Sequence, residues 1–100
     1  MKIALLLAST LLMSTSAFAN AELAEKKACL ACHAADSKRI GPSFKEIAAK
    51  YADDKKAVAT LSGKVKKGGV GVWGAIPMPA NPQVTDAEAK TLVQWILTHK

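Results

Sequence analysis

The chain has 100 residues, with 14 basic and 8 acidic side chains and a formal net charge of +6. A chain of this length forms one small domain, whose core alone rarely contributes more than about 3–5 kcal/mol, so a disulfide, a metal or a cofactor is expected to add stability. The positive charge favours an anionic partner surface, but only 5% of the residues are aromatic and no nucleic-acid-binding motif is present. Nucleic acid is therefore not an expected partner.

Residues 1–19 contain the three parts of a secretory signal peptide. Lys2 gives a positive start, residues 3–13 are almost entirely apolar, and Ala17-Phe18-Ala19 is a small-residue cleavage site. The apolar run is too short to cross a bilayer, which takes about 20 residues; an uncleaved anchor is the alternative. We predict cleavage after Ala19, export to the periplasm and a mature domain of residues 20–100 without stable membrane insertion.

The apolar spacing of the mature domain predicts helices and no convincing strand. A loop with Gly41-Pro42 follows the first helix, and Gly68-Gly69 ends the third. Residues 70–84 hold three prolines and two glycines and are expected to be irregular. The expected helices cover residues 22–32, 44–52, 55–67 and the segment from the capping box at 85–88 to the chain end.

Cys29, Cys32 and His33 form a C-x-x-C-H motif, which is typical of covalent c-type haem attachment. Positions i, i+3 and i+4 share one face of a helix, so both sulfurs and the imidazole would point the same way. The sulfurs would form thioether bonds to the haem, and His33 would bind its iron. Three alternatives are possible. A structural disulfide would close only a very short loop. A thioredoxin-like redox pair needs a βαβ context, and a zinc site usually needs four ligands.

Met78 is the expected second ligand to the iron. After signal-peptide removal it is the only methionine, and His99 is the only other histidine. Pro77 and Pro79 stiffen the chain around Met78, whereas His99 is expected to be exposed near a helix C-terminus. The alternative is that Met78 fills a gap in the core.

These motifs, in their order along the chain, resemble those of short bacterial class I monohaem cytochromes c, the five-fifty-one type of denitrifying bacteria. The resemblance covers the whole mature domain and includes Gly41-Pro42, Gly71-Val72-Trp73-Gly74 and Ile76-Pro77-Met78-Pro79. It implies an all-α fold of about four short helices around one covalently bound haem c.

The resemblance also implies roles around the haem for four further residues. The Pro42 carbonyl would accept the ring N–H of His33, and Asn81 would donate to the Met78 sulfur. Trp73 would donate to a haem propionate, with Lys64 nearby. Simple packing for Trp73, a solvated lysine for Lys64 and a turn residue for Asn81 are the alternatives.

The expected function is single-electron transfer by a monomer that is not an enzyme. The resemblance implies a quinol-oxidising complex or another cytochrome as donor, and a nitrite reductase or a terminal oxidase as acceptor. A rim of cations would steer acidic partners; it comprises Lys26, Lys27, Lys38, Arg39, Lys64, Lys66 and Lys67.

Two other functions remain open. Ala75 and Ala80 stand where the family often has prolines, so the loop around Met78 would be softer and would hold Met78 less tightly. If Met78 dissociates, the iron could bind a gas or peroxide. A haem-free binding module with a Cys29–Cys32 disulfide is the other alternative.

Overall fold

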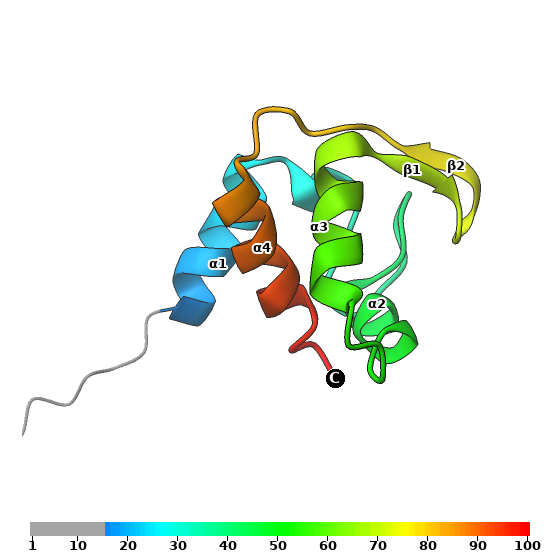
Figure 1. Cartoon of the computed structure of the whole chain (residues 1–100), viewed down its shortest axis with the longest axis horizontal. Coiled ribbons are helices and arrows are strands. Elements are labelled where there is room, and N and C mark those ends of the chain that lie inside the picture. The colour runs from blue at the N-terminus through cyan, green and yellow to red at the C-terminus, as the bar shows by residue number, and fades with distance from the viewer. Residues whose placement is uncertain (1–15) are drawn as a thin grey trace, which may run out of the picture.

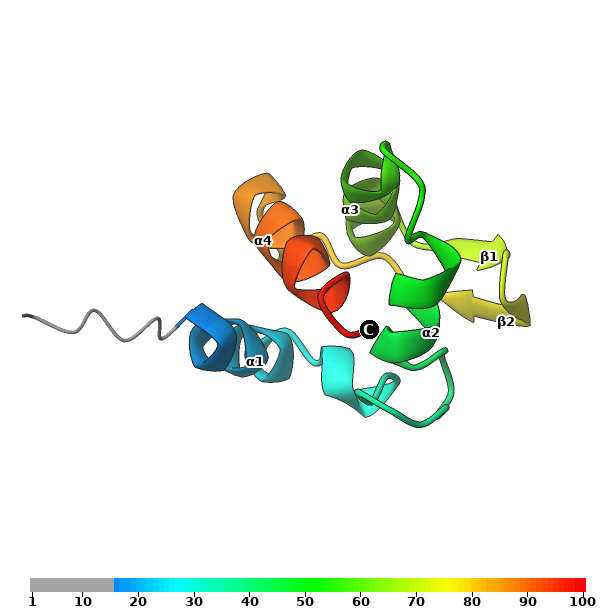
Figure 2. The same cartoon turned by 90° about the horizontal axis from the view of Figure 1, so that it is seen from below.

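The computed structural model describes residues 16–100, so the first 15 residues of the predicted signal peptide lie outside the described residues. Helix α4 is central and packs against α1, α2 and α3. A two-stranded antiparallel hairpin lies at the side of the molecule away from α1 in both views (Figures 1 and 2). The elements are α1 Ser16–Lys26, the 3-10 turn η1 Cys29–Ala31, α2 Phe44–Lys50, α3 Ala57–Lys67, β1 Gly69–Gly71, β2 Gly74–Met78 and α4 Asp86–Ile96.

Local hydrogen bonds define where the helices begin and end. The Ser43 hydroxyl accepts from the Glu46 amide at 3.0 Å at the start of α2. Thr85 and Glu88 form the predicted capping box of α4, with reciprocal bonds of 3.1 and 3.0 Å. Gly68, with φ of 77°, ends α3 as the sequence predicts. These three helices therefore follow the predicted order, with ends that differ by a few residues.

The core lies where α4 meets the other helices. Leu92 and Val93 of α4 are buried against Phe44 of α2 and Ala24 of α1. Val84, in the segment expected to be irregular, is only 1% exposed and closes this core beneath the start of α4. Mostly helical packing around α4 confirms the predicted fold class.

The predicted continuous helix over residues 22–32 is wrong. Helix α1 ends at Lys26, and Ala28 has a φ of +63°, which an α-helix cannot include. The chain resumes as η1, whose Cys29 carbonyl accepts from the His33 amide at 3.0 Å. The break at Ala28 allows α1 to pack on α4, while η1 and the residues after it line a cavity.

The expectation of an irregular segment over residues 70–84 is also wrong in its first half. Strand β1 pairs with β2 in the register Gly69↔Met78 and Gly71↔Gly74. Gly71 and Gly74 flank the Val72-Trp73 tip with φ values of 101° and 115°, which side-chain-bearing residues rarely adopt. Within residues 16–100, no helix has the length and apolar character needed to cross a membrane.

Candidate functional site

A cavity of about 490 Å³ brings together the four predicted haem-binding residues. Cys29, Cys32 and His33 come from η1 and the residues after it, and Met78 comes from the end of β2. The volume is typical of pockets for cofactors and other small molecules. The core side chains that line the cavity are Phe44, Ile47, Leu61, Val65, Val93 and Ile96.

The imidazole of His33 is held in one orientation. Its Nδ1 lies 2.6 Å from the Pro42 carbonyl oxygen, and its ring stacks on Phe44 at 5.7 Å between centroids. Because a carbonyl only accepts, Nδ1 carries the hydrogen and Nε2 has a free lone pair. A histidine that binds a metal through Nε2 needs this tautomer. The contact between His33 and Pro42 is the one that the family resemblance implies.

Gly41 lies directly against the His33 ring. A Cβ at this position would be 2.6 Å from Cε1 and 2.9 Å from Nδ1 of His33. The Gly41 amide donates to the Cys32 carbonyl at 2.8 Å, which fixes the loop to the attachment motif. The site therefore requires glycine at this position, a role that the sequence analysis did not assign.

The two cysteines are free thiols and both line the cavity. Burial is the main reason that the pKa of the Cys29 thiol is raised, and the nearby Cys32 adds to it, while a backbone hydrogen bond opposes it. The structure thus does not contain the alternative disulfide. No cluster of three or more His, Cys, Asp or Glu suitable for a metal ion occurs among the described residues, and the only sheet among residues 16–100 is the hairpin.

Met78 is held at the base of the hairpin and packs against the core. A side chain on Gly68 would collide with the Met78 carbonyl oxygen and with the backbone of Pro79 and Ala80. The close approach of these two backbone segments fixes Met78 where β1 and β2 leave the helical body. The sulfur therefore belongs to a well-anchored segment.

Large apolar side chains that are exposed surround the cavity. The exposed fraction ranges from 42% for Trp73 to 67% for Ile76, which is unfavourable for side chains facing water. A flat apolar group in the cavity would cover them, and the cysteine, histidine and methionine would supply its covalent and iron-binding partners. The residues present thus fit a haem; the exposed apolar set is Ile40, Val70, Val72, Trp73 and Ile76.

Both residues expected near the haem propionates line the cavity, whereas Asn81, which is expected to donate to the Met78 sulfur, does not. Lys64 and Trp73 are both at the cavity, and the Lys50 ammonium lies 5.4 Å from the centre of the Trp73 ring. Asn81 Nδ2 instead donates to the carbonyls of Val65 and Pro79, at 3.0 and 3.3 Å. The resemblance implies that the side-chain amide of Asn81 donates to the Met78 sulfur, but in this structure it donates to backbone carbonyls instead.

His99 is half-buried, which corrects the expectation that it is exposed. Its ring lies 4.6 Å from the Trp95 ring and 5.3 Å from the Phe44 ring, between centroids. Its Nδ1 lies 3.0 Å from the carbonyls of Trp95 and Ile96. His99 lies beyond the end of α4 at Ile96, and its spacing of four from Trp95 is the signal that would have placed the two side chains near each other.

The expected rim of cations is only partly formed. Lys38, Arg39 and Lys64 line the cavity. Lys27 and Lys66 instead pair with acidic side chains, at 3.6 and 3.2 Å. The positive charge near the cavity is thus smaller than the sequence suggested.

A covalent haem motif, an oriented histidine and a methionine around one apolar cavity define a small c-type cytochrome. Comparison with known families agrees, because residues 19–100 match the model for cytochrome c. The chain belongs to the cytochrome c family, and accordingly carries a covalently bound haem c with its iron and acts as a small electron carrier.

Individual relatives support this assignment along nearly the whole chain. Cytochrome c-552 of Nitrosomonas europaea is 55% identical over 93 residues, covering 93% of this chain and 90% of that protein. Cytochrome c-551 of Azotobacter vinelandii is 60% identical over 79 residues, covering 79% and 95%. The crystal structure of wild-type Nitrosomonas europaea cytochrome c552 superposes with a TM-score of 0.78 at 56% identity, covering 80% of this chain and 99% of that one.

Proposed function

We propose that this protein is a periplasmic single-electron carrier whose haem iron is bound by His33 and Met78. Cys29 and Cys32 would hold the haem through thioether bonds. The observation that carries the proposal is that these four residues, from two distant parts of the sequence, line one apolar cavity. The haem supplies the one-electron chemistry of its iron.

The surrounding residues favour electron transfer over catalysis. With His33 and Met78 both bound, no position on the iron is open to a substrate, and thioether ligation raises the reduction potential. The hydrogen bond from His33 to Pro42 prevents the imidazole from turning between redox states. The anchoring of Met78 against Gly68 supports a permanent ligand over gas or peroxide binding through a labile one.

Export and processing belong to the same proposal. Cleavage after Ala19 would remove the first residues of α1, because the helix begins at Ser16. The buried Ala24, through which α1 joins the core, would remain in a mature domain of residues 20–100. The mature protein would then work in the periplasm as a monomer.

The proposed partners are acidic redox proteins. Lys38, Arg39 and Lys64 at the cavity would steer them toward the haem and make association faster at low salt. A quinol-oxidising complex or another cytochrome would donate the electron. A nitrite reductase or a terminal oxidase would accept it. Trp73 and Lys64 are proposed to contact the haem propionates.

The test is the visible spectrum of the reduced holoprotein with and without carbon monoxide. We expect a sharp low-spin haem c spectrum that carbon monoxide does not change, because His33 and Met78 would both hold the iron. A spectrum that shifts on addition of the gas would contradict stable Met78 ligation and would favour gas binding. A colourless protein, purified from cells that attach haem, would instead favour the haem-free module.

A further inference from the structure

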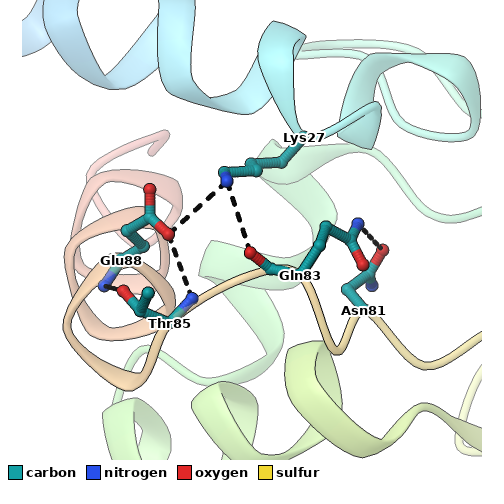
Figure 3. A network of polar contacts seen from close by, with 5 residues as sticks. All are labelled: Lys27, Asn81, Gln83, Thr85 and Glu88. Carbon is teal, nitrogen blue, oxygen red and sulfur yellow. Dashed lines mark hydrogen bonds and ion pairs between the residues drawn. The ribbon is translucent and has the colours of Figure 1, made fainter.

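A network of polar contacts joins the segment before the haem attachment motif to the segment after Met78 (Figure 3). The Lys27 ammonium donates to the Gln83 carbonyl at 3.3 Å and lies 3.6 Å from a Glu88 carboxylate oxygen. The Gln83 side chain in turn donates from Nε2 to Oδ1 of Asn81 at 3.3 Å. The two segments that carry the haem ligands are thus connected outside the haem cavity.

Asn81 is the point where this network reaches the segment of Met78. Its Nδ2 donates to the carbonyls of Val65 and Pro79, and its backbone amide also donates to Val65 at 3.1 Å. Val65 belongs to α3, and Pro79 directly follows Met78. Asn81 therefore fastens the chain beside Met78 to a helix of the core.

The amide of Asn81 performs this task in only one of its two orientations. Turned by 180°, its oxygen would face the carbonyls of Val65 and Pro79, which can only accept. These two carbonyls therefore fix the orientation in which Nδ2 binds both of them, and the donor at Gln83 Nε2 gives Asn81 Oδ1 a partner in that orientation. The Lys27 ammonium holds the Gln83 backbone in place for this purpose.

We propose that Gln83 is a positioning residue for Met78, acting through Asn81. The inference deepens the proposed function, since it rests on Met78 being an iron ligand. Gln83 limits the rate and extent to which the Met78 segment moves away from the cavity. Loss of its hydrogen bond makes Met78 easier to displace from the iron.

The measurement is the binding of imidazole, which competes with Met78, to the oxidised holoprotein. A neutral hydrogen bond contributes about 0.5–1.5 kcal/mol, and Gln83 is exposed, so the lower part of that range applies. We expect the apparent dissociation constant of imidazole to fall about 2- to 5-fold in Gln83→Ala. Gln94→Ala, at an exposed glutamine of α4, should bind imidazole as the wild type does.

A second variant tests the hydrogen-bond donor. Gln83→Glu keeps the length of the side chain but has no donor at neutral pH, so it loses the hydrogen bond to Asn81 Oδ1. We expect Gln83→Glu to bind imidazole at least as tightly as Gln83→Ala does, with Gln94→Glu as the control for charge. Wild-type imidazole affinity in both Gln83 variants would overturn the inference, even if their melting temperatures fell.

The methyl resonance of Met78 distinguishes failure of this inference from failure of the proposed function. In the reduced wild type, a methyl group bound beside the porphyrin is shifted far upfield by the ring current. Absence of that shifted resonance would refute Met78 ligation itself. Its presence, with unchanged imidazole affinity in the Gln83 variants, would refute only the positioning role.

Discussion

Substitution of Gly41 by alanine tests how closely the haem site is built around His33. The new Cβ would lie 2.6 Å from the ring Cε1, whereas carbon atoms pack at about 3.5–4.0 Å, so the imidazole or the loop must move by about 1 Å. Such overpacking costs about 1–3 kcal/mol. The weakened His33–Pro42 hydrogen bond adds about 0.5–1.5 kcal/mol, and the stiffer unfolded chain returns about 0.4–1 kcal/mol.

The net expectation for Gly41→Ala is a loss of about 0.5–4 kcal/mol in the free energy of unfolding. Guanidinium unfolding of the holoprotein, followed by visible absorbance and by circular dichroism, measures this loss. The reduction potential should rise, because an imidazole without its acceptor is less basic and stabilises ferric iron less.

Gly63→Ala is the matched control for this experiment. Gly63 lies within α3, and a Cβ there would meet no atom within 4 Å. Alanine should therefore stabilise the protein by up to about 1 kcal/mol through its helix propensity. If Gly41→Ala is as stable as Gly63→Ala and keeps the wild-type potential, the packing of Gly41 against His33 is not as described.

Three further substitutions test separate parts of the molecule. Met78→Ala should lower the reduction potential and allow carbon monoxide to bind, because the thioether favours ferrous iron; an unchanged potential would refute Met78 ligation. Lys50→Gln should speed amide hydrogen exchange over residues 70–76 about 2- to 5-fold relative to Lys45→Gln, because a cation over an exposed ring contributes about 0.5–1 kcal/mol; equal rates in the two variants would show that Lys50 does not hold Trp73. The pKa of Glu88 is lowered from its ordinary value of 4.5 chiefly by the Thr85 backbone hydrogen bond and further by Lys27 (Figure 3). The stabilising effect of the Glu88 carboxylate is thus present above pH 4.5 and is lost as the pH falls through the lower pKa of the folded state. Glu88→Gln should therefore make the free energy of unfolding, measured with urea, depend less on pH on the acid side. An unchanged pH dependence would contradict the lowered pKa.

Sequence patterns predicted those parts of the fold that depend on neighbours along the chain. The Thr85 capping box and the Gly68 stop are local signals, and α3 and α4 lie where these signals placed them. The break at Ala28 has no local signal, because alanine favours helix and adopts its positive φ only where the surrounding structure requires it. Helix α1 ends early because the chain must change direction between the part that packs on α4 and the turn η1 that carries Cys29 to the cavity.

The candidate site was predictable in its chemistry and less so in its surroundings. The C-x-x-C-H spacing and the single mature methionine identify four residues that the structure does bring to one cavity. The partners of Asn81 and the burial of His99 depend on which backbone carbonyls and aromatic rings tertiary packing brings near them. Neither a motif nor helical periodicity contains that information.

The hairpin shows why part of this fold cannot be derived from protein contacts alone. Hydrophobic periodicity identifies a strand when one face is buried against other protein atoms, but both strands are largely exposed here. The apolar residues Val70, Val72 and Ile76 face the haem cavity rather than a protein core. The haem that we propose for this cavity would be their partner, so the cofactor would supply the burial that stabilises the hairpin. A sequence read without the cofactor therefore predicts loop in the segment that would cover the haem.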